Sequence, residues 1–66
     1  MTELLIHMTE RGFKLLGFCK DVVLVDRGEG NVHRYVTWTW WKGDTFHGHY
    51  FGGFDEAVED FVRRIK

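Results

Sequence analysis

The sequence predicts a small α+β domain of the order α-β-β-β-β-α, in which an antiparallel meander sheet carries both helices packed on one face. Three observations favour this class: helical spacing at both ends of the chain, four short strand-like runs between them, and glycine-containing turns that separate the runs. The 66 residues suit one domain, so we expect residues 1–66 to form a single compact unit.

The first helix is predicted for residues 3–11. Thr2 is a suitable N-cap, and Gly12 suits the left-handed position that closes many helices. Two short apolar runs follow, at residues 13–18 and 22–25, and both predict strands, the second because it is rich in β-branched residues. The apolar residues of the first helix, at helical spacing, are Leu4, Leu5 and Met8.

A turn is predicted at residues 28–31, where glycine and asparagine tolerate positive φ. Strands at 32–41 and 45–51 then form a hairpin that holds all three tryptophans and both tyrosines. The last helix begins with acidic residues and ends with basic ones, an order that complements the helix dipole. Its apolar stripe consists of Phe54, Ala57, Val58, Phe61, Val62 and Ile65.

The register of this hairpin decides which side chains are exposed, because a shift of one residue moves every side chain to the other face. We expect residues 42–44 to form a three-residue loop, since a two-residue loop would bury two histidines among tryptophans without partners. One face of the hairpin is then almost wholly apolar and comprises Val36, Trp38, Trp40, Phe46, Gly48 and Tyr50. The other face, here called the outer face, comprises Tyr35, Thr37, Thr39, Trp41, Thr45, His47, His49 and Phe51.

The composition argues against several classes of protein. The formal net charge is −1, so nucleic acid would have to be bound by a local basic patch. The single cysteine, Cys19, cannot form an internal disulfide and fits a reducing compartment. There is no signal-peptide pattern and no apolar run of about 18 residues, so we expect a cytoplasmic protein that does not enter a membrane.

The motif His47-Gly-His49 raises the question of a metal site, because alternate residues of a strand share a face. A zinc site needs at least one more ligand, and Cys19 and His33 are the remaining candidates. Their spacing matches no known metal motif, so we predict no bound metal and no cofactor.

The same two histidines suggest an enzyme as the alternative. Paired imidazoles suit general acid–base cleavage of RNA, and Lys42 or Arg34 would hold a phosphate. No nucleophile elbow, phosphate-binding loop or paired-carboxylate motif accompanies them. We therefore assign no catalytic residue in the leading interpretation.

Residues 3–16, Glu-Leu-Leu-Ile-His-Met-Thr-Glu-Arg-Gly-Phe-Lys-Leu-Leu, resemble the first helix and strand of HicA-type toxins. Those toxins are small mRNA interferases with a double-stranded-RNA-binding-like fold, so the resemblance implies helices outside a sheet. Their catalytic histidine lies in a Gly-Ser-His motif after the first strand, where this chain has Cys19-Lys20-Asp21. The resemblance therefore implies a fold rather than an activity.

The second half of the chain is similar to short uncharacterised bacterial and phage-borne proteins. A phage or mobile-element origin would fit a small protein that binds and modulates a host enzyme. The similarity implies no residue-level role. The pattern that carries it is Tyr35-Val-Thr-Trp38 … Gly48-His-Tyr-Phe51 … Ala57 … Asp60-Phe61 … Arg63.

These patterns together predict a small cytoplasmic module without catalytic activity, which binds another protein or a second copy of itself through the outer face of the hairpin. A protein partner is favoured over nucleic acid because of the net charge. The alternative is an RNA-binding protein or RNase that uses His47 and His49. Trp41 is the expected aromatic anchor, and the candidate binding residues around it are Tyr35, Thr37, Thr39, His47 and His49.

Overall fold

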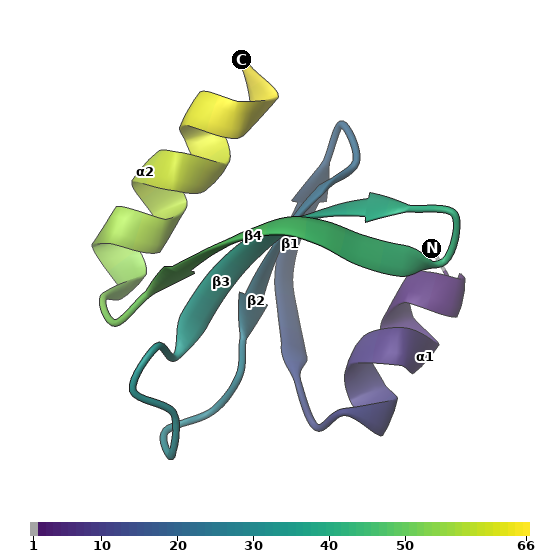
Figure 1. Cartoon of the computed structure of the whole chain (residues 1–66), viewed down its shortest axis with the longest axis horizontal. Helices are drawn as coiled ribbons and strands as arrows, with labels where there is room; N and C mark the ends of the chain where they lie inside the picture. The colour runs from purple at the N-terminus through teal and green to yellow at the C-terminus, as the bar shows by residue number, and fades with distance from the viewer. Residues whose placement is uncertain (1) are drawn as a thin grey trace.

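The computed structural model describes residues 2–66 and contains two helices and one four-stranded antiparallel sheet (Figure 1). The strands lie in the sheet in chain order, β1-β2-β3-β4. The predicted fold class and the order of its elements are therefore confirmed. The elements are α1 (Thr2–Glu10), β1 (Lys14–Cys19), β2 (Val22–Asp26), β3 (Tyr35–Trp41), β4 (Asp44–Phe51) and α2 (Phe54–Ile65). No helix within residues 2–66 has the length and apolar character that crossing a bilayer requires.

The two helices lie on opposite faces of the sheet, so the prediction that both pack on one face is wrong (Figure 1). α1 packs on Val23 and Val25 of β2. α2 packs on the other face, where the ring of Phe61 lies beside Gly17, which pairs with Leu24. Successive strand residues point to opposite faces, so these contacts separate the helices.

The reason lies in β2, the strand at which the two layers meet. All four residues from Val22 to Val25 are buried, at 0 to 7% exposure. A strand with one wet face alternates apolar and polar residues, whereas a strand buried on both faces reads as a continuous apolar run. The run 22–25 therefore requires a helix on each side.

The core under α1 is wholly apolar. Leu4 and Met8, one helical turn apart, are each 1% exposed and meet three valines of β2 and β3. Four partly buried side chains surround this cluster: Phe13, Leu15, Trp38 and Trp40. The ring of Phe13 stacks on that of Trp38, with centroids 6.0 Å apart. These contacts bury the three valines, Val23, Val25 and Val36, completely.

The β1–β2 turn and the β3–β4 turn are each two residues long. Lys20 and Asp21 have φ of 48° and 65°, and Lys42 and Gly43 have φ of 49° and 79°. Positive φ at both central residues defines the type I′ turn, whose twist matches that of the flanking strands. The predicted three-residue loop at 42–44 is therefore wrong, and β4 begins at residue 44.

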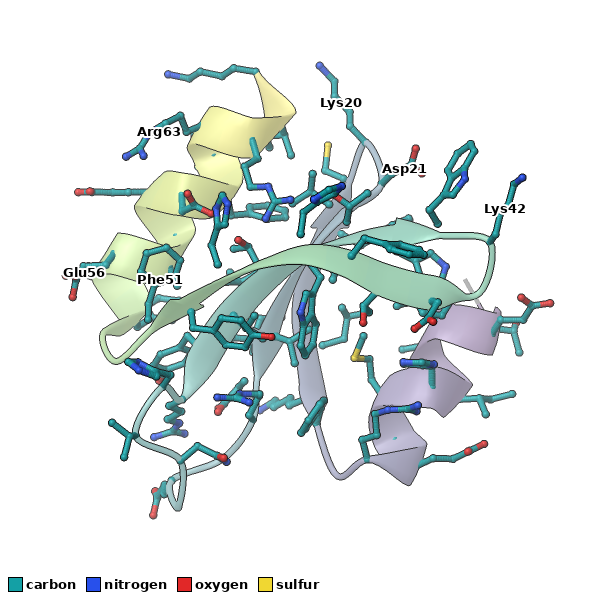
Figure 2. All side chains as sticks on the ribbon, viewed as in Figure 1. Lys20, Asp21, Lys42, Phe51, Glu56 and Arg63 are labelled. Carbon is teal, nitrogen blue, oxygen red and sulfur yellow. The ribbon has the colours of Figure 1, made fainter. Side chains whose placement is uncertain are left out.

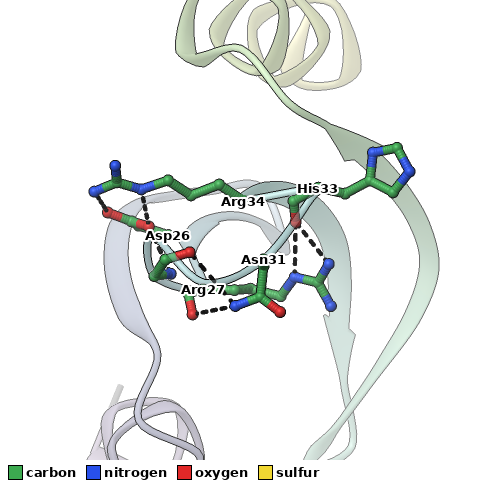
Figure 3. Close-up of polar contacts among 6 residues, drawn as sticks. Asp26, Arg27, Asn31, His33 and Arg34 are labelled. Carbon is green, nitrogen blue, oxygen red and sulfur yellow. Dashed lines mark hydrogen bonds and ion pairs between the residues drawn. The ribbon is translucent and has the colours of Figure 1, made fainter.

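Side-chain hydrogen bonds hold the loop between β2 and β3 (Figure 3). Arg34 donates from Nε and Nη2 to the two carboxylate oxygens of Asp26, at 2.8 and 2.9 Å. Arg27 donates to the carbonyl oxygen of His33, and Asn31 donates to the carbonyl oxygen of Arg27 at 2.8 Å. These bonds keep residues 27–34 in a closed loop, so β3 begins at residue 35 rather than at the predicted residue 32.

Candidate functional site

A β-bulge in β4 determines which of its side chains face α2. Near the turn, Thr39 pairs with Phe46. Farther from the turn, Thr37 pairs with His49. Thr37 is two residues from Thr39 on β3, whereas His49 is three residues from Phe46 on β4. One extra residue is therefore inserted in β4, within residues 47–48.

The local geometry of the bulge is demanding. His47 has φ +52°, in the left-handed region that is unfavourable for residues with a Cβ. A Cβ at Gly48 would lie 2.6 Å from Nε1 of Trp38, so only glycine fits beside that indole. Without the extra residue, the two-residue turn would direct His49 to the α1 face. With it, His49 faces α2.

His49 meets a buried carboxylate on α2. Its Nδ1 lies 3.0 Å from Oδ2 and 3.2 Å from Oδ1 of Asp60. Asp60 is 7% exposed, and its Oδ2 also accepts a 2.6 Å hydrogen bond from the hydroxyl of Thr37, which is fully buried. The bulge thus completes a contact that joins β3, β4 and α2.

Arg64 extends this contact along β3. Its Nη1 donates to the carbonyl oxygen of Thr37 at 3.1 Å and to the Thr37 hydroxyl at 2.9 Å. Its Nη2 donates to the hydroxyl of Thr39 at 2.9 Å. The chain of hydrogen bonds from Arg64 through Thr37 and Asp60 to His49 is called the polar relay below. Within residues 2–66, every buried side-chain nitrogen and oxygen has a hydrogen-bond partner.

The relay keeps Asp60 ionised. Burial alone raises the pKa of the Asp60 carboxyl, but hydrogen bonds from Thr37 and His49, together with the charges of His49 and Arg64, outweigh it and lower the pKa below its ordinary value. An ionised Asp60 can only accept hydrogen bonds, so Nδ1 of His49 carries the hydrogen that it donates. The Nε2 atom of His49 has no hydrogen bond within residues 2–66, and half of the side chain is exposed (51%).

The far end of the β3–β4 hairpin is a second, apolar feature of the same face. Trp41 is 54% exposed and Phe46 is 45% exposed. Both share the face of Thr39, because Phe46 pairs with Thr39 and Trp41 lies two residues farther along β3. Lys42, at the tip of the hairpin, lies 6.0 Å from the centre of the Trp41 ring (Figure 2). This exposed aromatic area is called the hairpin end below.

The six predicted binding residues therefore divide into two groups. Trp41, His47 and His49 are exposed, as expected for an outer face. Thr37 is fully buried beneath α2, so its predicted place on an exposed surface is wrong. Thr39 binds Arg64. The ring of Tyr35 packs edge-on against Phe54 of α2, at 5.4 Å.

The face assignments of the hairpin are confirmed in part. The pairing of Val36 with Tyr50 is as predicted. Phe46 lies on the α2 face rather than the apolar face, because the tight turn shifts the register near the tip. The bulge also breaks the strict alternation that would place His47 and His49 on one face.

No group of three or more histidine, cysteine, aspartate and glutamate side chains that could hold a metal occurs in the part of the chain that the structure describes. The two additional ligands considered from the sequence lie at opposite ends of the sheet. Cys19 ends β1 beside the β1–β2 turn, whereas His33 precedes β3 in the loop at the other end. They cannot converge on the two histidines.

Sequence reasoning missed Asp60 and Arg64, the two residues of α2 that build the relay. Ala57, Asp60 and Arg64 recur at three- and four-residue spacing, so they lie on one side of the helix. Ala57 belongs to the apolar stripe, and the two charged residues border the stripe on its Ala57 side. The stripe itself therefore gave no signal that Asp60 is buried, because charged residues at the border of a stripe are expected to be exposed.

Comparison with known proteins identifies no relative: no protein-family model, curated protein or solved structure matches this chain.

Proposed function

We propose that this chain is an interaction module without catalytic activity, which binds another protein through the hairpin end. The observation that supports the proposal is the joint exposure of Trp41 and Phe46 on the α2 face of the sheet. Large aromatic side chains that are exposed together are typical of contact sites and supply much of their binding energy. Trp41 is the anchor in this proposal.

The charges at the hairpin end favour a protein over nucleic acid. Lys42 and Asp44 flank Trp41 on either side of the turn, and their charges cancel. Nucleic-acid sites instead show an excess of lysine and arginine that neutralises phosphates. A neutral aromatic surface with a polar rim fits a protein contact better.

A second copy of the chain is the simplest partner. In a two-fold arrangement of hairpin ends, Lys42 of one copy would meet Asp44 of the other, so the surface is complementary to itself. A contact of ordinary size covers about 800 Å² per partner, which is nearly a fifth of the 4385 Å² of accessible surface. The contact must therefore extend past the hairpin end onto the neighbouring surface.

Both edges of the sheet favour contact through side chains rather than through added strands. β1 has an irregularity between Leu15 and Gly17, and β4 has the bulge at residues 47–48. Bulges at edge strands disrupt the row of free backbone groups that another strand would pair with. The proposed contact with a partner therefore uses exposed side chains.

The proposal is tested by affinity capture from lysate treated with nuclease, using the wild type and Trp41→Ala. We expect the wild type to retain a protein partner, or itself in a differently tagged copy, and the variant to lose it. Tyr50→Ala serves as a matched control, because Tyr50 is also an exposed aromatic residue but lies on the α1 face. Capture that is unchanged in Trp41→Ala, or lost equally in the control, would contradict the proposal.

Self-association is tested separately by sedimentation of charge variants. Lys42→Asp and Asp44→Lys alone should each weaken the dimer by placing like charges in contact, and the double exchange should restore it. Lys42→Asp suits the fold, because Asp-Gly is a preferred type I′ turn. A chain that stays monomeric at every concentration would exclude a second copy as the partner.

A further inference from the structure

We infer that His49 and Arg63, on either side of the Asp60 carboxylate, form a binding site for a phosphate group at the edge where α2 passes over β4. This site is separate from the hairpin end and does not depend on the proposed function. Three features of this edge support it: the geometry of the two side chains, the charges around Asp60, and the backbone that places His49 there.

The ring of His49 has a fixed orientation. Its Nδ1 is committed to Asp60, at 3.0 Å from Oδ2, and the ring cannot turn without breaking that contact. Its other nitrogen, Nε2, is left for a ligand, on a side chain that is half exposed. When Nε2 is protonated it becomes a fixed donor for an anion.

Arg63 lies on the other side of the same carboxylate. Its Nη1 lies 4.0 Å from Oδ1 of Asp60, the same oxygen that lies 3.2 Å from Nδ1 of His49. The two side chains are thus neighbours across one carboxylate. Arg63 is 73% exposed and holds Asp60 only at long range, so its guanidinium is available to an incoming ligand (Figure 2). A guanidinium binds phosphate oxygens in pairs, with more geometric specificity than an ammonium.

The charges around Asp60 are mainly positive. Asp60 faces His49 from β4 and Arg63 and Arg64 from its own helix, while β3 contributes the uncharged hydroxyl of Thr37. Protonated His49 adds a third positive charge, and Glu59, which lines a surface hollow together with Arg63, adds a negative one at its far side. Both terminal nitrogens of Arg64 donate to β3, which leaves His49 and Arg63 as the donors for an added anion.

The placement of His49 requires strained backbone. A hydrogen bond to Asp60 alone needs no bulge, because β3 already supplies the hydroxyl of Thr37. Placing His49 there instead requires His47 at φ +52° and a glycine at residue 48. Strained backbone of this kind accumulates where a side chain must be aimed at a ligand.

The inference is tested by NMR titration of the folded, full-length chain with inorganic phosphate at constant ionic strength. We expect saturable shifts of the His49 ring nitrogens and of the Arg63 Nε signal, and weaker binding when His49 is neutral. Acetate should bind less tightly than phosphate. An absence of saturable shifts, or equal binding of acetate, would overturn the assignment.

Substitutions locate the site. Arg63→Gln and His49→Gln should each weaken phosphate binding by about tenfold, as expected for loss of one charge-assisted hydrogen bond. Arg11→Gln, at an exposed arginine of α1, is the matched control and should have no effect. Arg63 is on the surface, so its variant remains folded. Binding unchanged in Arg63→Gln would overturn the inference.

Two phosphate esters distinguish the source of the phosphate. Phenyl phosphate represents a monoester, and a dinucleotide represents the diester of a nucleic-acid backbone. Tighter binding of phenyl phosphate would support a phosphorylated protein or metabolite, and tighter binding of the dinucleotide would support a nucleic acid. Trp41→Ala should bind phosphate like the wild type, so failure of this site and failure of the hairpin end are seen separately.

Discussion

The two faces of the sheet are held by different kinds of contact, although they share the same four strands. On the α1 face, Leu4 and Met8 pack on three valines, and this buried cluster is apolar. On the α2 face, the polar relay fastens the helix to β3 and β4. One face is stabilised by burial of apolar area, and the other by hydrogen bonds whose direction matters.

This difference separates the parts of the molecule that stabilise it from those that can serve a ligand. Apolar packing tolerates exchange of one apolar residue for another of similar volume. A satisfied polar network fixes particular atoms in particular places. The exposed ends of the α2 face, at His49 and at Trp41, are therefore the places where we expect specific contacts.

The largest expected effect lies in the α1 core. Leu4→Ala should lower the free energy of unfolding by about 2–5 kcal/mol, because it removes a buried side chain and leaves a cavity. Leu5→Ala is the matched control, since Leu5 is 47% exposed and Leu4 is 1% exposed. Its effect should stay within about 0.5 kcal/mol. Chemical denaturation measures both, and equal effects would contradict the described orientation of α1.

A smaller loss is expected on removing the centre of the polar relay. Asp60→Ala should lower the free energy of unfolding by about 1–3 kcal/mol, because it leaves the buried hydroxyl of Thr37 without its acceptor. Glu59→Ala, at the adjacent exposed position, should have little effect. If the two variants unfold at the same denaturant concentration, the relay does not fasten α2.

The relay should also make stability depend on pH in the acidic range. The pKa of Asp60 is lower in the folded chain than its ordinary value, so the unfolded chain binds more protons in acid. The contribution of the ionised Asp60 carboxylate to the free energy of unfolding is complete above about pH 4. It is lost as the pH falls through the lowered pKa of Asp60 in the folded chain.

The measurement is the free energy of unfolding of the wild type and Asp60→Asn as the pH falls. The variant should show a shallower loss. The variant should still lose some stability in acid, because a hydrogen bond from Arg34 lowers the pKa of Asp26 in the folded chain. Identical acid profiles for the two chains would contradict this role of Asp60.

The smallest expected effect concerns His47 in the bulge. His47→Gly should leave the free energy of unfolding unchanged or raise it by about 1 kcal/mol, because glycine adopts the left-handed conformation without strain. Gly48→Ala is the opposite case and should destabilise the fold by about 1–3 kcal/mol, since its Cβ would collide with Trp38. Thermal unfolding compares the two, and a large loss in His47→Gly would show that the imidazole itself supports the fold.

The sequence predicted most of the fold because periodicity is local. The helical stripe of residues 54–65 and the β-branched run of 22–25 both gave elements of the expected type. The same run indicates that both faces of β2 are covered, since all four of its residues are apolar. The placement of the helices was therefore available in the sequence, although it was predicted wrongly.

The candidate site was harder to predict because it depends on a register that changes within one hairpin. Two uniform registers were considered from the sequence, and the structure combines them through the bulge at residues 47–48. The partner of His49 lies eleven residues away on α2. No pattern in the hairpin alone specifies that contact, because it depends on the tertiary position of the helix.

The adjacent residues Trp40 and Trp41 allow the most direct test of the division between the two faces. Trp40 meets His7 of α1 edge-on, at 4.9 Å, and Trp41 is exposed on the other face. The decisive measurement is the recovery of the protein partner by Trp41→Ala, with its free energy of unfolding measured on the same sample. We predict that recovery is lost while the free energy of unfolding stays within about 0.5 kcal/mol of the wild type. A partner that is retained by the folded variant would contradict the assignment of the hairpin end as the contact surface.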